Sequence, residues 1–315
     1  MSLRWGFLGA SRIGRSALAT AVLAAGHRLH AIAARDLSRA KTFAAAFAIP
    51  HATDSYEALL ANPDIDAIYI ALPNHLHLPW TLQALAAGKH VLCEKPLALT
   101  ADEVAAMQRA ESQSGCRVME AFCHRFHPQF DFVRNLLQQN AIGETRCIQI
   151  NSVAPITDSN DYRWKAAYGG GALFDLGCYQ VSLMRSLLDR EPISALGCQA
   201  LRGDVDASFS AQLDFGGGLA CQMFCAFEGA RQQSLRILGS EGQLTIDWPI
   251  STKGRETIVT WNNQEQRFAP MDAYCAMVEH FAAAISLEAP MRFGLEDSYR
   301  QAIVMDELRR SATAS

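Results

Sequence analysis

The sequence predicts an α/β protein with a doubly wound parallel sheet in its N-terminal part and a second domain that is mainly β. Three observations predict this fold. The chain has 315 residues, more than the roughly 100 to 200 of one ordinary domain. Residues 1–120 alternate short apolar runs with helical patterns, which is typical of repeated βαβ units. After Gly143 the strand patterns predominate.

Strand and helix patterns follow one another in the first domain. Apolar runs predict strands over 5–9, 29–34, 67–72, 90–93 and 117–121, the last being the sixth strand of the sheet. Helical patterns cover 13–25, 36–48, 54–60, 78–87 and 100–115. Asp54-x-x-Glu57 and Thr100-x-x-Glu103 have the form of capping boxes at two helix starts. Right-handed crossovers make such units a doubly wound sheet, with a ligand crevice at the carboxyl ends of its strands.

The pattern changes beyond residue 120. Pro128 suits the first turn of a helix that reaches about Asn140. Residues 207–215 alternate apolar and polar side chains, as an antiparallel strand with one buried face does, and three glycines then turn the chain into 219–227. Further strands are expected at 235–238 and 243–248, and helices at 274–284 and 295–310. We expect domains at 1–120 and 121–294, and a C-terminal helix in 295–315 that could pack back on the first domain.

Composition narrows the class of protein. Apolar residues make up 50% and charged residues 19%, which fits a globular chain. Lys and Arg total 28 against 32 Asp and Glu, or 28 − 32 = −4, so no nucleic-acid partner is expected. Nine cysteines without C-x-x-C spacing predict reduced thiols in the cytoplasm, and neither a disulfide framework nor zinc. The short apolar run at the N-terminus is not expected to be a signal peptide, and no membrane span is expected.

A glycine turn joins the first strand to the first helix. The segment contains the sequence Gly9-Ala10-Ser11-Arg12-Ile13-Gly14. In a dinucleotide fingerprint the first glycine makes the turn, the second lets the backbone approach the pyrophosphate, and the third allows close packing. Here Ser11 replaces the second glycine, so two of the three roles survive. A tight βα turn without a cofactor would also favour glycine.

The end of the second strand carries cations. NAD-binding sites usually have Asp or Glu there, to hold the ribose hydroxyls. This chain has Arg35 instead, and Arg39 lies one helical turn further on. Because Arg makes bidentate contacts with phosphate, the pair predicts a 2′-phosphate pocket and preference for NADP, with NAD as the alternative. The two arginines could otherwise belong to a solvated helix face with Asp36.

Glu94-Lys95-Pro96 follows the fifth strand, at the edge where the crevice should open. Pro96 restricts the preceding residue to extended conformations, so the backbone directs the lysine. A cation held there can polarise a carbonyl or hydroxyl oxygen. A plain surface turn would have the same composition.

The glycine turn, Glu94-Lys95-Pro96 and two further motifs carry a resemblance to a known family. On these four motifs the chain resembles the glucose-fructose oxidoreductase/inositol dehydrogenase (Gfo/Idh/MocA) family over nearly its whole length. The further motifs are Leu72-Pro73-Asn74-His75-Leu76-His77 and the stretch 169–179, Gly-Gly-Gly-Ala-Leu-Phe-Asp-Leu-Gly-Cys-Tyr. The resemblance implies a Rossmann domain plus an α+β domain with a large open, mostly antiparallel sheet, often used to form dimers or tetramers. Met119-Glu120-Ala121-Phe122 and the final Gly-Cys-Tyr look most like the dimeric dihydrodiol dehydrogenase and D-xylose dehydrogenase branch, which uses NADP.

Two side chains of the last motif suit acid/base chemistry. Asp175 and Tyr179 are four residues apart, so they project from one face of a helix. An ammonium group nearby would favour the phenolate of a tyrosine. The resemblance implies that Lys95 and Tyr179 transfer the proton and polarise the substrate oxygen, in an undecided division of roles, and that Asp175 orients the substrate. A core position with a capped hydroxyl is the alternative for Tyr179.

Cofactor contacts are assigned, partly from the resemblance, to Gly9, Ser11, Arg12, Ile13, Gly14, Arg35, Arg39, Leu72, Pro73, Asn74, His77, Glu94 and Lys95. For His77, which matches a family position near the nicotinamide end, a packing role is equally open. Arg125 and Trp164 could line the substrate pocket, although a surface or core role is equally open for each. His75 with His77, and His124 with His127, lack further ligands at a recognised spacing, so no metal site is expected.

The sequence hypothesis is therefore an NADP-dependent oxidoreductase. It would transfer hydride between nicotinamide and a secondary alcohol or ketone of a sugar, polyol or cyclic trans-diol, at a site between the two domains. Two alternatives stay open. One is an NADP(H)-binding sensor without turnover, and the other is a redox-assisted elimination, such as glycoside cleavage, with retained NAD.

Overall fold

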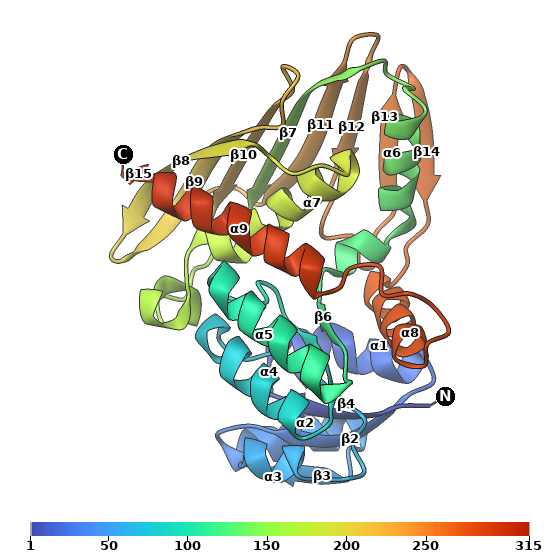
Figure 1. The fold of residues 1–315 in the computed structure, drawn as a ribbon, viewed down its shortest axis with the longest axis vertical. Coiled ribbons are helices and arrows are strands. Elements are labelled where there is room, and N and C mark those ends of the chain that lie inside the picture. The colour runs from blue at the N-terminus through green and yellow to red at the C-terminus, as the bar shows by residue number, and fades with distance from the viewer. Residues whose placement is uncertain (1, 315) are drawn as a thin grey trace. The chain divides into compact units, whose positions relative to one another are not determined.

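A computed structural model describes residues 2–314 of the chain, shown in Figure 1. The chain divides into two compact units. Unit 1 comprises Met1–Cys123 and Tyr274–Tyr299, and unit 2 comprises His124–Ala273 and Arg300–Ser315. The helix at 274–284, which the sequence placed with the second domain, therefore falls in unit 1. The last helix is shared by the two units.

Unit 1 is built on a six-stranded parallel sheet. Its order is β3-β2-β1-β4-β5-β6. Strand order reverses between β1 and β4, where ligands bind in open α/β sheets. This confirms the doubly wound fold. The third strand is only three residues long and not apolar, which explains why no hydrophobic run marks it. The strands are β1 (Arg4–Leu8), β2 (Arg28–Ala33), β3 (His51–Thr53), β4 (Ala67–Ile70), β5 (His90–Cys93) and β6 (Val118–Glu120).

The helices of unit 1 begin largely where the sequence indicates. Thr100 caps its helix by accepting the Glu103 amide hydrogen, as expected. The expectation for Asp54 is wrong, because Ser55 caps the next helix through the amide of Ala58. The helices are η1 (Gly14–Leu18, of π type), α1 (Ala19–Ala24), α2 (Leu37–Phe47), α3 (Tyr56–Leu60), η2 (Asn74–Leu76), α4 (His77–Ala86), α5 (Ala101–Ser114), α8 (Ala273–Ile285) and the first part of α9 (Leu295–Ser311).

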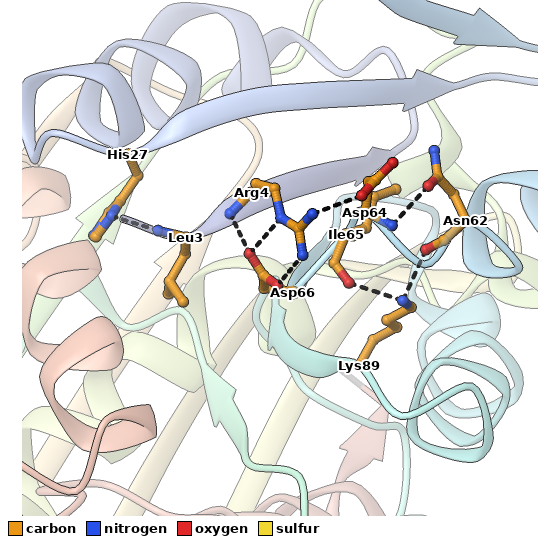
Figure 2. Close-up of polar contacts among 8 residues, drawn as sticks. All are labelled: Leu3, Arg4, His27, Asn62, Asp64, Ile65, Asp66 and Lys89. Carbon is orange, nitrogen blue, oxygen red and sulfur yellow. Dashed lines mark hydrogen bonds and ion pairs between the residues drawn. The ribbon is translucent and has the colours of Figure 1, made fainter. Parts of the chain in front are cut away.

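Charged side chains fasten the amino ends of β1 and β4, at the edge of the sheet opposite the glycine turn (Figure 2). Arg4 pairs with Asp64 at 2.7 Å and with Asp66 at 2.8 Å, and its amide also donates to Asp66. Lys89 is buried, and its ammonium donates to two backbone carbonyls, those of Asn62 and Ile65. A buried ammonium needs such acceptors, so this cluster is structural.

Unit 2 contains a nine-stranded sheet in the described part of the chain, in the order β14-β13-β12-β11-β7-β10-β9-β8-β15. It is antiparallel except where β7 meets β10 and β8 meets β15. This confirms the large, mostly antiparallel sheet. The strands are β7 (Thr145–Val153), β8 (Ser194–Arg202), β9 (Val205–Asp214), β10 (Ala220–Ala226), β11 (Gln232–Gly239), β12 (Gln243–Asp247), β13 (Thr257–Trp261), β14 (Gln264–Phe268) and β15 (Thr313–Ala314).

Helices pack on one face of this sheet. Gln180 of α7 donates to the backbone carbonyl of Phe224 on β10, and Glu307 of α9 accepts the amide hydrogen of Ala195 on β8. The helices are η3 (Cys123–Phe126), which crosses between the units, α6 (Pro128–Gln138), η4 (Tyr162–Trp164), η5 (Ala166–Tyr168), η6 (Leu173–Gly177, of π type), α7 (Cys178–Leu188) and the second part of α9. Across residues 2–314, no helix combines the length and the apolar character needed to cross a membrane.

Candidate functional site

The glycine turn of unit 1 brings its backbone close to the neighbouring strand. Gly9 has φ of +101°, and its amide donates to the carbonyl of Ala33 at 2.9 Å. A Cβ at this position would lie 2.6 Å from the carbonyl oxygen of Ala71 and 3.0 Å from Leu72. Both the conformation and the close approach therefore require glycine. A tight turn of this kind between a strand and a helix is what the first glycine of a dinucleotide fingerprint makes.

Ser11 takes over a local role in the turn. Its hydroxyl accepts the amide hydrogen of Gly14 at 2.9 Å, where η1 begins. Gly14 in turn has no room for a Cβ, which would lie 2.9 Å from that hydroxyl. Ser11 thus stabilises the first turn of η1, because its hydroxyl accepts an amide hydrogen that a glycine at position 11 could not accept. Arg12 is exposed and Ile13 is half-buried at the same turn.

Arg39 reaches back from α2 to the glycine turn. Its guanidinium donates to the carbonyl oxygen of Ala10 at 3.1 Å, while the side chain remains exposed. Arg35 is also exposed, and its backbone bonds the hydroxyl of Tyr56. The Asp36 carboxylate is engaged at the helix start by Ser38, which together with Arg39 lowers its pKa. Two accessible cations therefore lie at the end of β2, and one is fixed beside the turn.

His77 connects the loop after β4 to the loop after β5. Its Nδ1 lies 2.8 Å from the carbonyl oxygen of Pro96, and its Nε2 lies 2.9 Å from that of Leu72. The ring is fully buried, and burial lowers its pKa to about 4 although both carbonyls act to raise it. A neutral imidazole can donate to only one of them. Pro73 and the buried Asn74 lie in the same loop.

Buried carboxylates brace the Glu-Lys-Pro turn on both sides. Glu94 accepts the hydroxyl hydrogen of Tyr69 at 2.6 Å, and burial beside this carboxylate raises the pKa of the phenol well above its usual value. Lys95 follows, joined to Pro96 by a cis peptide bond. Beyond it, Glu120 accepts the amide hydrogen of Leu97 at 2.9 Å. The bracing roles of Glu120 and Tyr69 were not predicted from the sequence, because neither contact is local in the chain.

In unit 2, Asp175 lies against an arginine that sequence reasoning missed. Arg163 Nε is 2.9 Å from Asp175 Oδ2, and Arg163 also pairs with Asp161 at 3.1 Å. The carboxylates raise the pKa of the guanidinium against the opposing effect of burial. The backbone carbonyl of Arg163 accepts the amide hydrogen of Gly171 at 3.0 Å. The loop before the glycine run is thus fastened to that run, and it presents a cation to Asp175.

Tyr179 lies beside a buried polar group of unit 2. The ring of His124 meets the Tyr179 ring edge to face, with centroids 5.3 Å apart. The Ser182 hydroxyl lies between the side chains of His124 and Arg125. It is 3.4 Å from Nε2 of His124, and it accepts a hydrogen from Nε of Arg125 at 2.7 Å. Arg125 is 0% exposed. The pKa of His124 lies well below its usual value because the histidine is buried and because the Arg125 charge is close. Arg125 is therefore a buried group bonded to Ser182, and Ser182 also contacts the histidine whose ring meets Tyr179.

Trp164 has two aromatic or cationic neighbours. The guanidinium of Arg202 lies 4.4 Å from its ring centroid, and the ring of Phe227 meets it edge to face at 5.2 Å. Cation–π contacts of this kind hold an indole in place. Together, the site residues form two sets, since those up to Lys95 belong to unit 1, and Arg125, Trp164, Asp175 and Tyr179 belong to unit 2.

Comparisons with known proteins match both parts of the chain to family models. Residues 3–122 match the model of an oxidoreductase family with an NAD-binding Rossmann fold, and residues 130–245 match that of the GFO/IDH/MocA C-terminal domain. These matches define an oxidoreductase with a dinucleotide-binding domain. The chain belongs to the Gfo/Idh/MocA family.

Several relatives have a name that states an activity. D-xylose 1-dehydrogenase (NADP(+)) 2 of Haloferax volcanii is 33% identical, and trans-1,2-dihydrobenzene-1,2-diol dehydrogenase of Xenopus laevis is 32% identical, each with 98% of this chain and 97% of the relative covered. The solved structure of KijD10, a 3-ketoreductase from Actinomadura kijaniata in complex with NADP and TDP-benzene, is 30% identical with a TM-score of 0.92, and the match covers 100% of this chain and 99% of that one.

Proposed function

We propose that the protein is an NADP-dependent oxidoreductase acting on a secondary alcohol or ketone of a sugar, a polyol or a cyclic trans-diol. The observation that carries this proposal is the contact of Arg39 with Ala10, which fixes a cation beside the glycine turn between β1 and η1. The activities named for the similar D-xylose, dihydrodiol and ketosugar enzymes support the substrate class.

The residues of unit 1 fit NADP. Gly9 allows the tight turn that a dinucleotide fingerprint needs, and Arg35 and Arg39 are exposed cations suited to a 2′-phosphate. We assign the remaining contacts with the cofactor to Ser11, Arg12, Ile13, Gly14, Leu72, Pro73, Asn74, His77, Glu94 and Lys95. When bound, the nicotinamide ring accepts or supplies the hydride.

The protein's own groups would handle the proton. In the oxidation direction the carbinol C–H bond breaks with loss of hydride, and the hydroxyl proton passes to a protein group. We assign Lys95 and Tyr179 to this task, one holding the substrate oxygen and the other exchanging its proton. Asp175, paired with Arg163, and Trp164 would orient the substrate. Arg125 would act through Ser182, because its guanidinium is buried and bonded there.

A turnover assay tests the function. Purified protein is mixed with NADP⁺ or NADPH and a panel of aldoses, polyols, trans-diols and ketosugars, and absorbance at 340 nm is followed. We expect turnover of at least one group of substrates, and faster turnover with NADP than with NAD. Tight NADPH binding with no absorbance change on any substrate would indicate a sensor instead. Product formation without net cofactor reduction would indicate redox-assisted elimination.

We also propose that the chain forms a homodimer or homotetramer through the outer face of the unit 2 sheet. On that face a shallow hollow is lined by Gln149, Asn151, Gln212, Gln222 and Phe224. Leu196 and Phe224 both line this hollow and are 69% and 38% exposed, so two large apolar side chains are exposed together on this face, as at an interaction surface. Buried thiols such as those of Cys93 and Cys225 suit a reducing compartment, and we propose the cytoplasm. Sedimentation analysis of Leu196→Glu, expected to be monomeric, tests the interface.

A further inference from the structure

Asp206 lies at the start of the helix that carries Asp175 and Tyr179, although it belongs to a different element. It is the second residue of β9. Its carboxylate accepts the amide hydrogen of Leu173 at 2.6 Å, and it bonds the amide of Ala172 as well. Leu173 begins η6, which continues directly into α7. Asp206 thus bonds two first-turn amides that have no partner within the helix itself.

The glycine run is shaped around this carboxylate. Gly171 has φ of +112°, and a Cβ there would collide with Asp206 Oδ1. The amide of Gly171 donates to the carbonyl of Arg163 at 3.0 Å. The amides of residues 171–173 therefore all have fixed acceptors, and two of the three bonds go to Asp206. A glycine at 171 is needed because the carboxylate occupies the space of its side chain.

The pairing of β8 with β9 is irregular next to Asp206. Asp206 pairs with Leu201 of β8, next to a register shift between Ala200 and Leu201. Such bulges re-aim side chains. Here the side chain points at the helix start, where a negative charge is also favoured by the helix dipole. Burial raises the pKa of this carboxyl to about 6, while the amide bonds lower it.

We propose that Asp206 is a positioning residue. By holding the first amides of η6 at the helix start, it fixes the rotation of the helix about its axis and its position along that axis, and so it places Asp175 and Tyr179 together for the reaction. Asp175 lies within η6 and Tyr179 is the second residue of α7, so both are within two turns of the bonded amides. A shift of that start would displace both side chains and leave the cofactor turn of unit 1 unchanged. The inference rests on the proposed function for its catalytic part.

The matched control is Asp214, at the other end of the same strand. Its carboxylate also accepts a backbone amide hydrogen, that of Gly216 at 2.7 Å, but it serves an exposed turn. Asp206→Asn keeps the shape of the side chain and presents an amide hydrogen to one of the two donors. We expect kcat of Asp206→Asn to fall about tenfold, equivalent to about 1.4 kcal/mol of barrier. KM for NADPH should be unchanged, and Asp214→Asn should retain wild-type kcat.

Hydrogen exchange supplies a readout that does not depend on turnover. In the wild type the amides of Ala172 and Leu173 should exchange slowly, and in Asp206→Asn they should exchange faster while those of the α7 interior stay protected. Fast exchange of both amides in the wild type, or wild-type kcat in Asp206→Asn, would overturn the inference. If the wild type turns over no substrate, the proposed function fails, and the exchange data alone decide whether Asp206 fixes the helix start.

Discussion

The two units hold their functional residues by different means. In unit 1 the site residues are held mainly by close backbone packing and by hydrogen bonds with neutral partners. Examples are the glycine turn at Gly9, the His77 ring between two carbonyls, and the Glu94 and Glu120 carboxylates that accept from a hydroxyl and an amide. In unit 2 they are fixed by charges, with Arg163 on Asp175 and Asp206 on the helix start. A parallel sheet delivers its loops to one edge, so backbone geometry suffices there. An open antiparallel sheet does not bring its loops to one edge, so contacts between residues distant in the sequence, such as the ion pair of Arg163 with Asp175, hold the site residues of unit 2.

The largest effect should come from the two proposed catalytic residues. Tyr179→Phe and Lys95→Met should each lower kcat by about 10² to 10⁴, the usual contribution of general acid–base groups. NADPH affinity should survive in Tyr179→Phe, because that residue belongs to unit 2. Tyr168→Phe, at an exposed tyrosine of the same unit, is the control. Unchanged turnover in both active-site variants would show that the roles are wrongly assigned.

Arg39→Ala, a substitution in unit 1, should reduce the preference for NADPH over NADH. Losing a charge-assisted contact of about 1.5 to 3 kcal/mol should weaken NADPH binding about 10- to 100-fold and leave NADH binding nearly unchanged. Fluorescence titration with each cofactor measures this. Lys41→Ala, which removes an exposed cation from the same helix, should change neither affinity. Tighter binding of NADH than of NADPH by the wild type would contradict the phosphate pocket.

Stability should decline in mild acid through the buried histidines of both units. Burial lowers the pKa of His77 and of His127 to about 4, below the value near 6.5 of an unfolded chain. The unfolded state then binds more protons between pH 6.5 and 4, so the free energy of unfolding falls as pH falls, by up to about 3 kcal/mol per group. Asp206 has the opposite effect, because its pKa is raised to about 6 in the folded protein. Between pH 6 and about 4 the folded state binds the extra proton, so this group increases the free energy of unfolding as pH falls.

The contribution of His127 in unit 2 to this pH dependence can be measured separately from that of His77 in unit 1. His127 caps α6 through its Nδ1, which accepts the amide hydrogen of Gln129 at 3.3 Å. Asn is also a good cap, so His127→Asn should retain the helix and remove one titrating group. Melting temperatures at pH 7 and pH 5 should then differ less than in the wild type. An equal or larger difference would show that His127 does not contribute to the pH dependence.

The smallest effect is expected at the structural edge of unit 1. Arg4→Met removes ion pairs that are partly exposed, so the melting temperature should fall only by a few degrees (Figure 2). The NADPH affinity should stay as in the wild type, since this edge is opposite the glycine turn. A change in NADPH affinity comparable to that of Arg39→Ala would mean that the two edges of the sheet are coupled.

Local signals predicted much of the fold and the motif-bearing turns. The glycine turn, the cap at Thr100 and the alternation in β9 depend on residues close in sequence. Asp206, Arg163 and Glu120 could not be found in this way. Each acts on a segment far away in the chain or outside its own motif, and nothing in the composition around Asp206 distinguishes it from the solvent-exposed Asp204. The π-type turns at Gly14 and Leu173 likewise depend on packing rather than on a sequence pattern.

The most direct test of the account follows the hydride itself. A substrate accepted in the turnover assay is prepared with deuterium on its carbinol carbon, incubated with the protein and NADP⁺, and the reduced cofactor is analysed by mass spectrometry. The account predicts one deuterium in NADPH and slower turnover of the labelled substrate when hydride transfer limits the rate. Net product with no deuterium in the released cofactor would contradict it.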